Sequence, residues 1–82
     1  IPAMSEQIEY TVTALGVDGG TYVYRVRTEG VMPPMWVAQE AYRRHGQALA
    51  SGDLTEPLGP KWQVTIDGMP ADQWHRAAMN MD

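Results

Sequence analysis

The stretch IEYTVTA, residues 8–14, alternates apolar and polar side chains, which is typical of a strand that buries one face. The stretch YVYRVR, residues 22–27, continues this alternation shortly after two glycines. Two such runs joined by a short glycine-containing segment predict an antiparallel hairpin. We expect Val17-Asp18-Gly19 to form its loop, with Gly19 in the left-handed conformation that three-residue loops require.

The alternation also predicts the register of the hairpin, because directly opposed residues lie on the same face of a sheet. Placing Tyr10 opposite Val26 keeps the apolar side chains of both strands together. The same register places Glu9 opposite Arg27 on the other face, where opposite charges stabilise a cross-strand pair by about 0.2–1 kcal/mol. Turn chemistry and charge pairing therefore select one register.

A helix is predicted to follow the hairpin. Residues 30–33 form a crossover loop, because prolines lack the amide that a strand needs, and Pro34 suits the first position of a helix. The helix is expected to end at Ser51-Gly52, with Gly52 as a left-handed cap. Gly46 inside it costs about 1 kcal/mol relative to alanine and indicates either close packing on the sheet or early fraying. The residues expected on its inner side are Met35, Ala38, Ala41, Tyr42, His45, Ala48 and Leu49.

Residues 61–67 alternate again and predict a third strand after a connecting segment, residues 53–60. An apolar stripe over residues 70–79 predicts a short final helix that begins at Pro70. We therefore expect an α+β fold of order β-β-α-β, in which one helix covers a three-stranded antiparallel sheet. Its apolar interior is expected to include Ile8, Tyr10, Val12, Tyr24, Val26, Ala41, Leu49, Trp62, Val64 and Ile66.

Length and composition exclude several classes of protein. The 82 residues suffice for one domain, which we expect to span residues 4–82, with residues 1–3 a cloning remnant ahead of an ordinary cytosolic start at Met4. Six Lys and Arg against ten Asp and Glu give a net charge of −4, which disfavours nucleic acid as a partner. The chain has no cysteine, and its longest uncharged stretch, residues 30–39, is too short to cross a bilayer. We expect a cytoplasmic protein without a membrane partner.

Residue types that carry catalysis are few and scattered. His45 and His75 are the only imidazoles, and no carboxylate is spaced to join them in a metal site or to orient a general base. Ser5 and Ser51 lack the strained turn and nearby base that a nucleophile needs. Gly19-Gly20 precedes a strand and not a helix N-terminus, so it does not resemble a phosphate-binding loop. We expect no enzymatic activity, no cofactor and no metal.

The stretch VMPPMWV, residues 31–37, is uncharged and too apolar to turn inward completely. Trp36 falls on the polar side of the predicted helix, where it either anchors a protein partner or folds over the helix end and seals the core, the second being the preferred interpretation. Arg25 and Arg27 alternate on a strand that could be a sheet edge, where charges usually prevent aggregation but could also select an added acidic strand. The predicted partner contacts are Arg25, Arg27, Met32 and Trp36.

In size and element order, the segment from Glu6 to Asp67 resembles small phage-encoded proteins that bind host machinery, such as phage inhibitors of bacterial RNA polymerase. The resemblance implies binding to a large host enzyme through the sheet and its loops, with Arg25 and Arg27 as contacts. Our hypothesis is a non-enzymatic protein-binding module that inhibits or modulates a host enzyme by occlusion. Two alternatives are an assembly protein that self-associates through an edge strand and a weak binder of single-stranded nucleic acid, which would use Arg25, Arg27, Arg43, Arg44 and Trp36.

Overall fold

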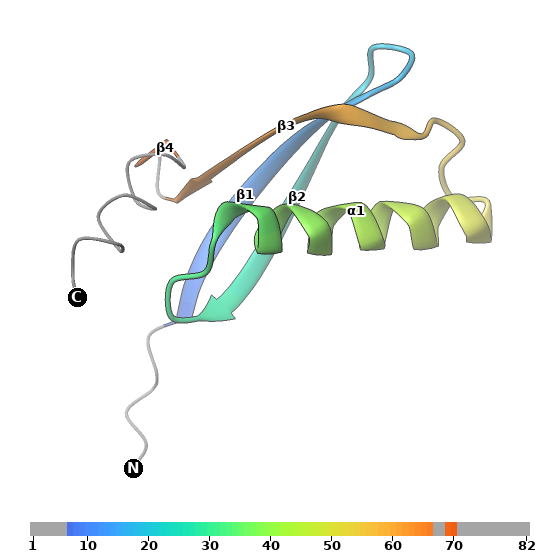
Figure 1. Ribbon diagram of the computed structural model, residues 1–82. Coiled ribbons are helices and arrows are strands. Elements are labelled where there is room, and N and C mark those ends of the chain that lie inside the picture. Colours follow the sequence, from blue (N-terminus) through green and yellow to red (C-terminus); the bar gives the residue numbers. More distant parts are fainter. Residues whose placement is uncertain (1–6, 67–68, 71–82) are drawn as a thin grey trace.

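The computed structural model describes residues 7–66 and 69–70. The elements in chain order are β1 (Gln7–Gly16), β2 (Thr21–Glu29), α1 (Pro34–Ser51), β3 (Leu58–Ile66) and β4 (Met69–Pro70). The strands pair antiparallel in the order β2-β1-β3-β4, and α1 lies across one face of the sheet (Figure 1). The predicted α+β class and β-β-α-β order are confirmed, with the two-residue β4 added beside β3.

The hairpin of β1 and β2 has the register that its alternation predicts, with Tyr10 opposite Val26. The Gly16 amide donates to the Gly20 carbonyl at 2.7 Å, which leaves residues 17–19 as the loop. Gly19 has a φ of 95°, in the left-handed region that favours glycine. Turn chemistry and alternation therefore determine this part of the fold locally.

The core lies between α1 and the facing side of the sheet. Leu49, which the sequence places in the interior, is only half-buried. Val37 is buried although the sequence analysis did not assign it, whereas Met35, predicted on the inner side, is 57% exposed. At 3.6 residues per turn, Met35 lies roughly 100° around the helix from the centre of the buried stripe. The buried apolar residues in contact are Tyr10, Val12, Val26, Val37, Ala38, Ala41 and Val64, with Ile8, Tyr24, Trp62 and Ile66 packed against them.

Helix α1 has the predicted bounds and the predicted cap. Gly52 has a φ of 85°, and its amide donates to the Leu49 carbonyl at 3.2 Å. Neither interpretation of Gly46 holds, because the helix continues past it to Ser51 and a Cβ built on it has no described atom within 4 Å apart from its chain neighbours and the adjacent helix backbone. Across the part of the chain that the structure describes, no helix is long and apolar enough to span a membrane.

Strand β3 begins at Leu58, three residues before the predicted start, so the connecting segment is shorter than expected. A β-bulge between Ala14 and Gly16 of β1 lets the pairing continue to Leu58. Pro60 is tolerated here because the described β4 pairs only with the far end of β3, at Thr65 and Ile66.

Beyond the sheet, the predicted final helix lies outside the described residues apart from its first position. That position is Pro70, which lies in strand β4, opposite Thr65 of β3, and does not begin a helix. The same limit applies to His75, whose position is outside the described residues.

Candidate protein-binding groove

The loop between β2 and α1 is fixed to the core by one buried tyrosine. The hydroxyl of Tyr10 accepts a hydrogen bond from the Met32 amide at 2.9 Å and donates one to the Gly30 carbonyl at 3.4 Å. The Thr28 hydroxyl donates to the same carbonyl at 2.8 Å, and Gly30 has a φ of 84°. The Met32 side chain, which is 37% exposed, is therefore presented by a backbone with fixed geometry.

Trp36 lies in the first turn of α1 and faces solvent. Pro33 is extended, with φ −60° and ψ 145°, and its carbonyl accepts from the amides of Trp36 at 3.0 Å and Val37 at 3.4 Å. Val37 closes the core at this end of the helix, and Trp36, one residue earlier and about 100° around the helix, is directed outward and is 64% exposed. The preferred interpretation, that Trp36 seals the core, is therefore wrong.

A groove of about 420 Å³ separates β2 from the first half of α1. Residues 26–28 of β2 form one wall, and α1 from Trp36 to Arg44 forms the other. Met32, in the loop that joins the two elements, also lines it. The groove thus brings together three of the four predicted contacts, Arg27, Met32 and Trp36, whereas Arg25 does not line it.

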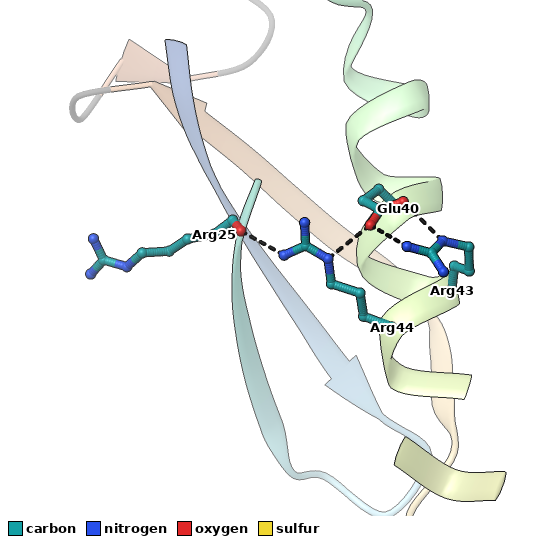
Figure 2. Close-up of polar contacts among 4 residues, drawn as sticks. All are labelled: Arg25, Glu40, Arg43 and Arg44. Carbon is teal, nitrogen blue, oxygen red and sulfur yellow. Dashed lines mark hydrogen bonds and ion pairs between the residues drawn. The ribbon is translucent and has the colours of Figure 1, made fainter. Parts of the chain in front are cut away.

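Two arginines of the groove share one carboxylate. The guanidinium of Arg43 donates to Glu40 from Nε at 3.0 Å and from Nη2 at 2.7 Å, and Arg44 Nε donates to it at 2.8 Å (Figure 2). The hydrogen bonds from Arg43 and then Arg44 lower the pKa of Glu40 from 4.5 to about 2. Arg44 also donates through Nη1 to the Arg25 carbonyl at 2.7 Å, which links α1 to β2.

Strand β2 forms an edge of the sheet in the part of the chain that is described. Backbone groups of an antiparallel strand point alternately toward and away from the partner strand. Because Gly20 bonds to Gly16, the even-numbered residues of β2 face β1, and the odd-numbered ones, including Arg25 and Arg27, face outward. The Arg25 carbonyl is occupied by Arg44, but the outward backbone groups of Arg27 have no hydrogen-bond partner among residues 7–66 and 69–70.

The side chains of Arg25 and Arg27 lie on the face of the sheet opposite α1. Figure 2 shows the Arg25 side chain extending away from the helix, and Arg27, two residues later, shares that face. Arg27 Nη2 lies 4.0 Å from Glu9 Oε2 in an exposed pair, a type worth about 0–1 kcal/mol. Among the residues that the structure describes, this is the one ion pair of either guanidinium group, so both can take a stronger partner.

Sequence reasoning missed a second polar site, which we call the His45 cluster: Tyr22, Tyr24, His45 and Glu56. His45 is 1% exposed; its Nε2 donates to the Glu56 carbonyl at 2.7 Å, since a carbonyl can only accept. In the neutral ring, Nδ1 therefore accepts from the Tyr24 hydroxyl, 2.6 Å away. Tyr22 contacts the imidazole edge-on, with ring centres 4.7 Å apart. Both ring nitrogens are thus used inside the fold.

The carboxylate of Glu56 joins the His45 cluster to the hairpin loop. It accepts from the Tyr22 hydroxyl at 2.7 Å and from the amides of Asp18 at 2.6 Å and Gly20 at 3.1 Å. The hydrogen bond from Tyr22 lowers the pKa of Glu56 most, and the hydrogen bond from the Gly20 amide lowers it further. The hydrogen bond between Tyr22 and Glu56 also raises the pKa of Tyr22. No sequence signal marked Glu56, because its partners come from a hairpin 36 residues away.

The two sites differ in what they can do chemically. The described residues contain no group of three His, Cys, Asp or Glu side chains placed to hold a metal ion. The groove instead combines an exposed tryptophan, guanidinium groups and a strand that forms an edge of the sheet as far as the chain is described, which are features that proteins use to bind peptide segments. Comparisons of the chain with protein-family models, with curated proteins and with solved structures found no match.

Proposed function

We propose that the protein is a non-enzymatic module that binds another protein through the groove between β2 and α1. The observation that carries this proposal is the 64% exposure of Trp36 beside Met32 on a fixed loop. Trp and Met are enriched at the centres of protein interfaces, where burying one such side chain dominates the binding energy. The protein would act by occupying a surface of its partner.

Self-association through the β2 edge is a second candidate, favoured by the open position of that strand. Two copies paired antiparallel about a two-fold axis at Val26 would place Arg25 of one copy across from Arg27 of the other. Like charges directly opposite destabilise such a pair. The charges of β2 therefore disfavour this register of a second copy.

Single-stranded nucleic acid is a weaker candidate for the groove. Arg43 and Arg44 line it together with Trp36, the combination that a stacking platform needs. Glu40 engages both of these arginines, however, and the chain as a whole carries a charge of −4. Phosphate backbones would meet net repulsion outside the groove.

The resemblance to phage inhibitors remains a prediction about which partner the groove binds. It would make the partner a large bacterial enzyme such as RNA polymerase, bound by occlusion. A bacterial lysate is therefore the appropriate source of partners for the first test of the groove.

The proposal is tested by affinity capture from that lysate with the wild-type protein and matched variants. Trp36→Ala and Met32→Ser alter the groove, whereas Val17→Ala removes another exposed apolar side chain, located in the hairpin loop. We expect Trp36→Ala to weaken capture by about 30-fold, as loss of a central anchor of about 2 kcal/mol implies, and Val17→Ala to leave it unchanged. Equal capture by all the variants would contradict the proposal.

A further inference from the structure

Resting on the proposed function, we infer that the groove takes an extended, acidic segment of the partner protein, which adds to the outer edge of β2 as a strand. The charges of the groove favour an acidic partner segment. Arg43 and Arg44 line it against the single carboxylate of Glu40, a surplus of one positive charge on a chain of net −4, and the guanidinium of Arg27 adds a cation on the other face of the same edge strand. An acidic segment is attracted here, while the rest of the molecule repels it.

The arginines retain donors for a carboxylate of the partner. Arg43 uses two hydrogen bonds on Glu40, and Arg44 uses one on Glu40 and one on the Arg25 carbonyl. A guanidinium has five N–H donors, so about three remain on each side chain. Glu40 therefore orients the guanidinium groups of Arg43 and Arg44 and leaves N–H donors on both of them for a partner.

The backbone of β2 offers hydrogen-bonding groups to an added strand. The outward amide and carbonyl of Arg27 have no partner among the described residues, whereas Arg44 covers the carbonyl of Arg25. An added strand therefore bonds at Arg27 and continues toward Glu29. Main-chain pairing of this kind provides affinity, and alternate side chains provide specificity.

The positions of the groove side chains along α1 match the repeat of an extended strand. Trp36, Glu40 and Arg44 are four residues apart and share one flank of the helix, and about 12 Å separates the first from the last. Two residues four positions apart on an extended strand are separated by about 13 Å, and their side chains point to the same face. The bound segment is therefore expected to place an apolar residue against Trp36 and Met32 and an acidic residue four positions away, near Arg44.

The opposite face of the added strand meets the other two arginines. A partner residue directly opposite Arg27 points to the same side of the sheet as Arg27 and Arg25. Among the described residues, Arg27 has only the exposed contact with Glu9 at 4.0 Å. A second acidic residue, an odd number of positions from the apolar one, completes the expected pattern.

The experiment uses a synthetic peptide of about ten residues, longer than a typical strand, in which Leu and Glu lie four positions apart and the other positions are mainly Thr. The readout is amide hydrogen exchange of the full protein followed by NMR. The Arg27 amide is expected to exchange rapidly in the free protein and to become about tenfold or more protected with saturating peptide. The amide of Val26, which already faces β1, serves as the internal control.

Two control peptides separate charge from strand addition. Replacing Glu by Lys is expected to weaken binding by about tenfold or more, and N-methylation of the peptide backbone is expected to abolish protection of Arg27. The variant Arg43→Gln is expected to weaken binding of the Glu peptide. Lys61→Gln, which removes an exposed cation outside the groove, is expected to leave it unchanged.

Any of four results would overturn the inference: no protection of Arg27 at millimolar peptide, equal binding of the Lys peptide, tighter binding of oligothymidylate in the groove, or a dimer of the free protein that already protects the Arg27 amide. The proposed function is judged separately. If capture from the lysate still depends on Trp36 while the peptide fails, the groove binds a protein of another chemistry.

Discussion

The two halves of α1 use polar and aromatic side chains in opposite ways. In the His45 cluster, on the second half, both ring nitrogens and the Glu56 carboxylate have partners within the fold. In the groove, on the first half, Trp36 faces solvent and the outward backbone of Arg27 has no partner among the described residues. The cluster therefore holds helix, hairpin and connection together, whereas the groove presents groups that the fold itself does not need.

The largest expected effect comes from breaking the cluster at its centre. His45→Ala leaves the part-buried Tyr24 hydroxyl and Glu56 carbonyl without their partner and opens a cavity where a buried side chain was, so the free energy of unfolding is expected to fall by about 2–4 kcal/mol. Urea denaturation measures this loss. Gln47→Ala, an exposed change on the same helix, is the control. A loss for His45→Ala no greater than for the control would show that the cluster is not structural.

A smaller loss of stability is expected from changing Glu56, at the edge of the His45 cluster, and this loss depends on pH. The folded-state pKa of Glu56 is lowered, so its contribution to stability is fully present above its unfolded pKa near 4.5 and is lost as the pH falls through the folded value. Glu56→Gln is expected to be less stable than the wild type at pH 7, by less than His45→Ala.

Thermal unfolding from pH 7 to pH 3 checks this dependence. The difference between the wild type and Glu56→Gln should shrink as the pH falls, while exposed Glu29→Gln should follow the wild type throughout. A constant difference across this range would mean that the ionised carboxylate does not fasten the hairpin loop.

The smallest change in stability is expected between the two regions, at Gly46. Its Cβ would meet open space, so Gly46→Ala should raise the free energy of unfolding by about 0.5–1 kcal/mol. Gly52→Ala should have the opposite sign, because φ is 85° at the cap. Urea denaturation of both variants tests this; destabilisation by Gly46→Ala would show that the helix packs more closely there than the structure indicates.

Local patterns predicted the hairpin well. Its register and the left-handed Gly19 depend only on the alternation of apolar and polar residues and on the loop length, and both are local features of the sequence. The phase of α1 was harder to predict: residues 35–38 are all apolar, so the sequence did not distinguish inward Val37 from outward Met35.

The candidate site was predicted in part. Met32 and Trp36 were selected as apolar side chains unusual for a surface and Arg27 as a charge on a possible edge strand, and all three line one groove. The Arg43–Glu40–Arg44 arrangement completes that groove, and it depends on how α1 lies against β2. The role of Glu56 depends on contacts between segments far apart in the chain, which a single sequence does not reveal.

The central claim, that the groove serves recognition and not folding, is tested most directly by measuring unfolding and binding on the same sample of Trp36→Ala. We expect its free energy of unfolding to stay within about 0.5 kcal/mol of the wild type, while its binding to the captured partner weakens by about 30-fold. A drop of about 2 kcal/mol or more in stability with binding intact would contradict the account, because Trp36 would then belong to the core.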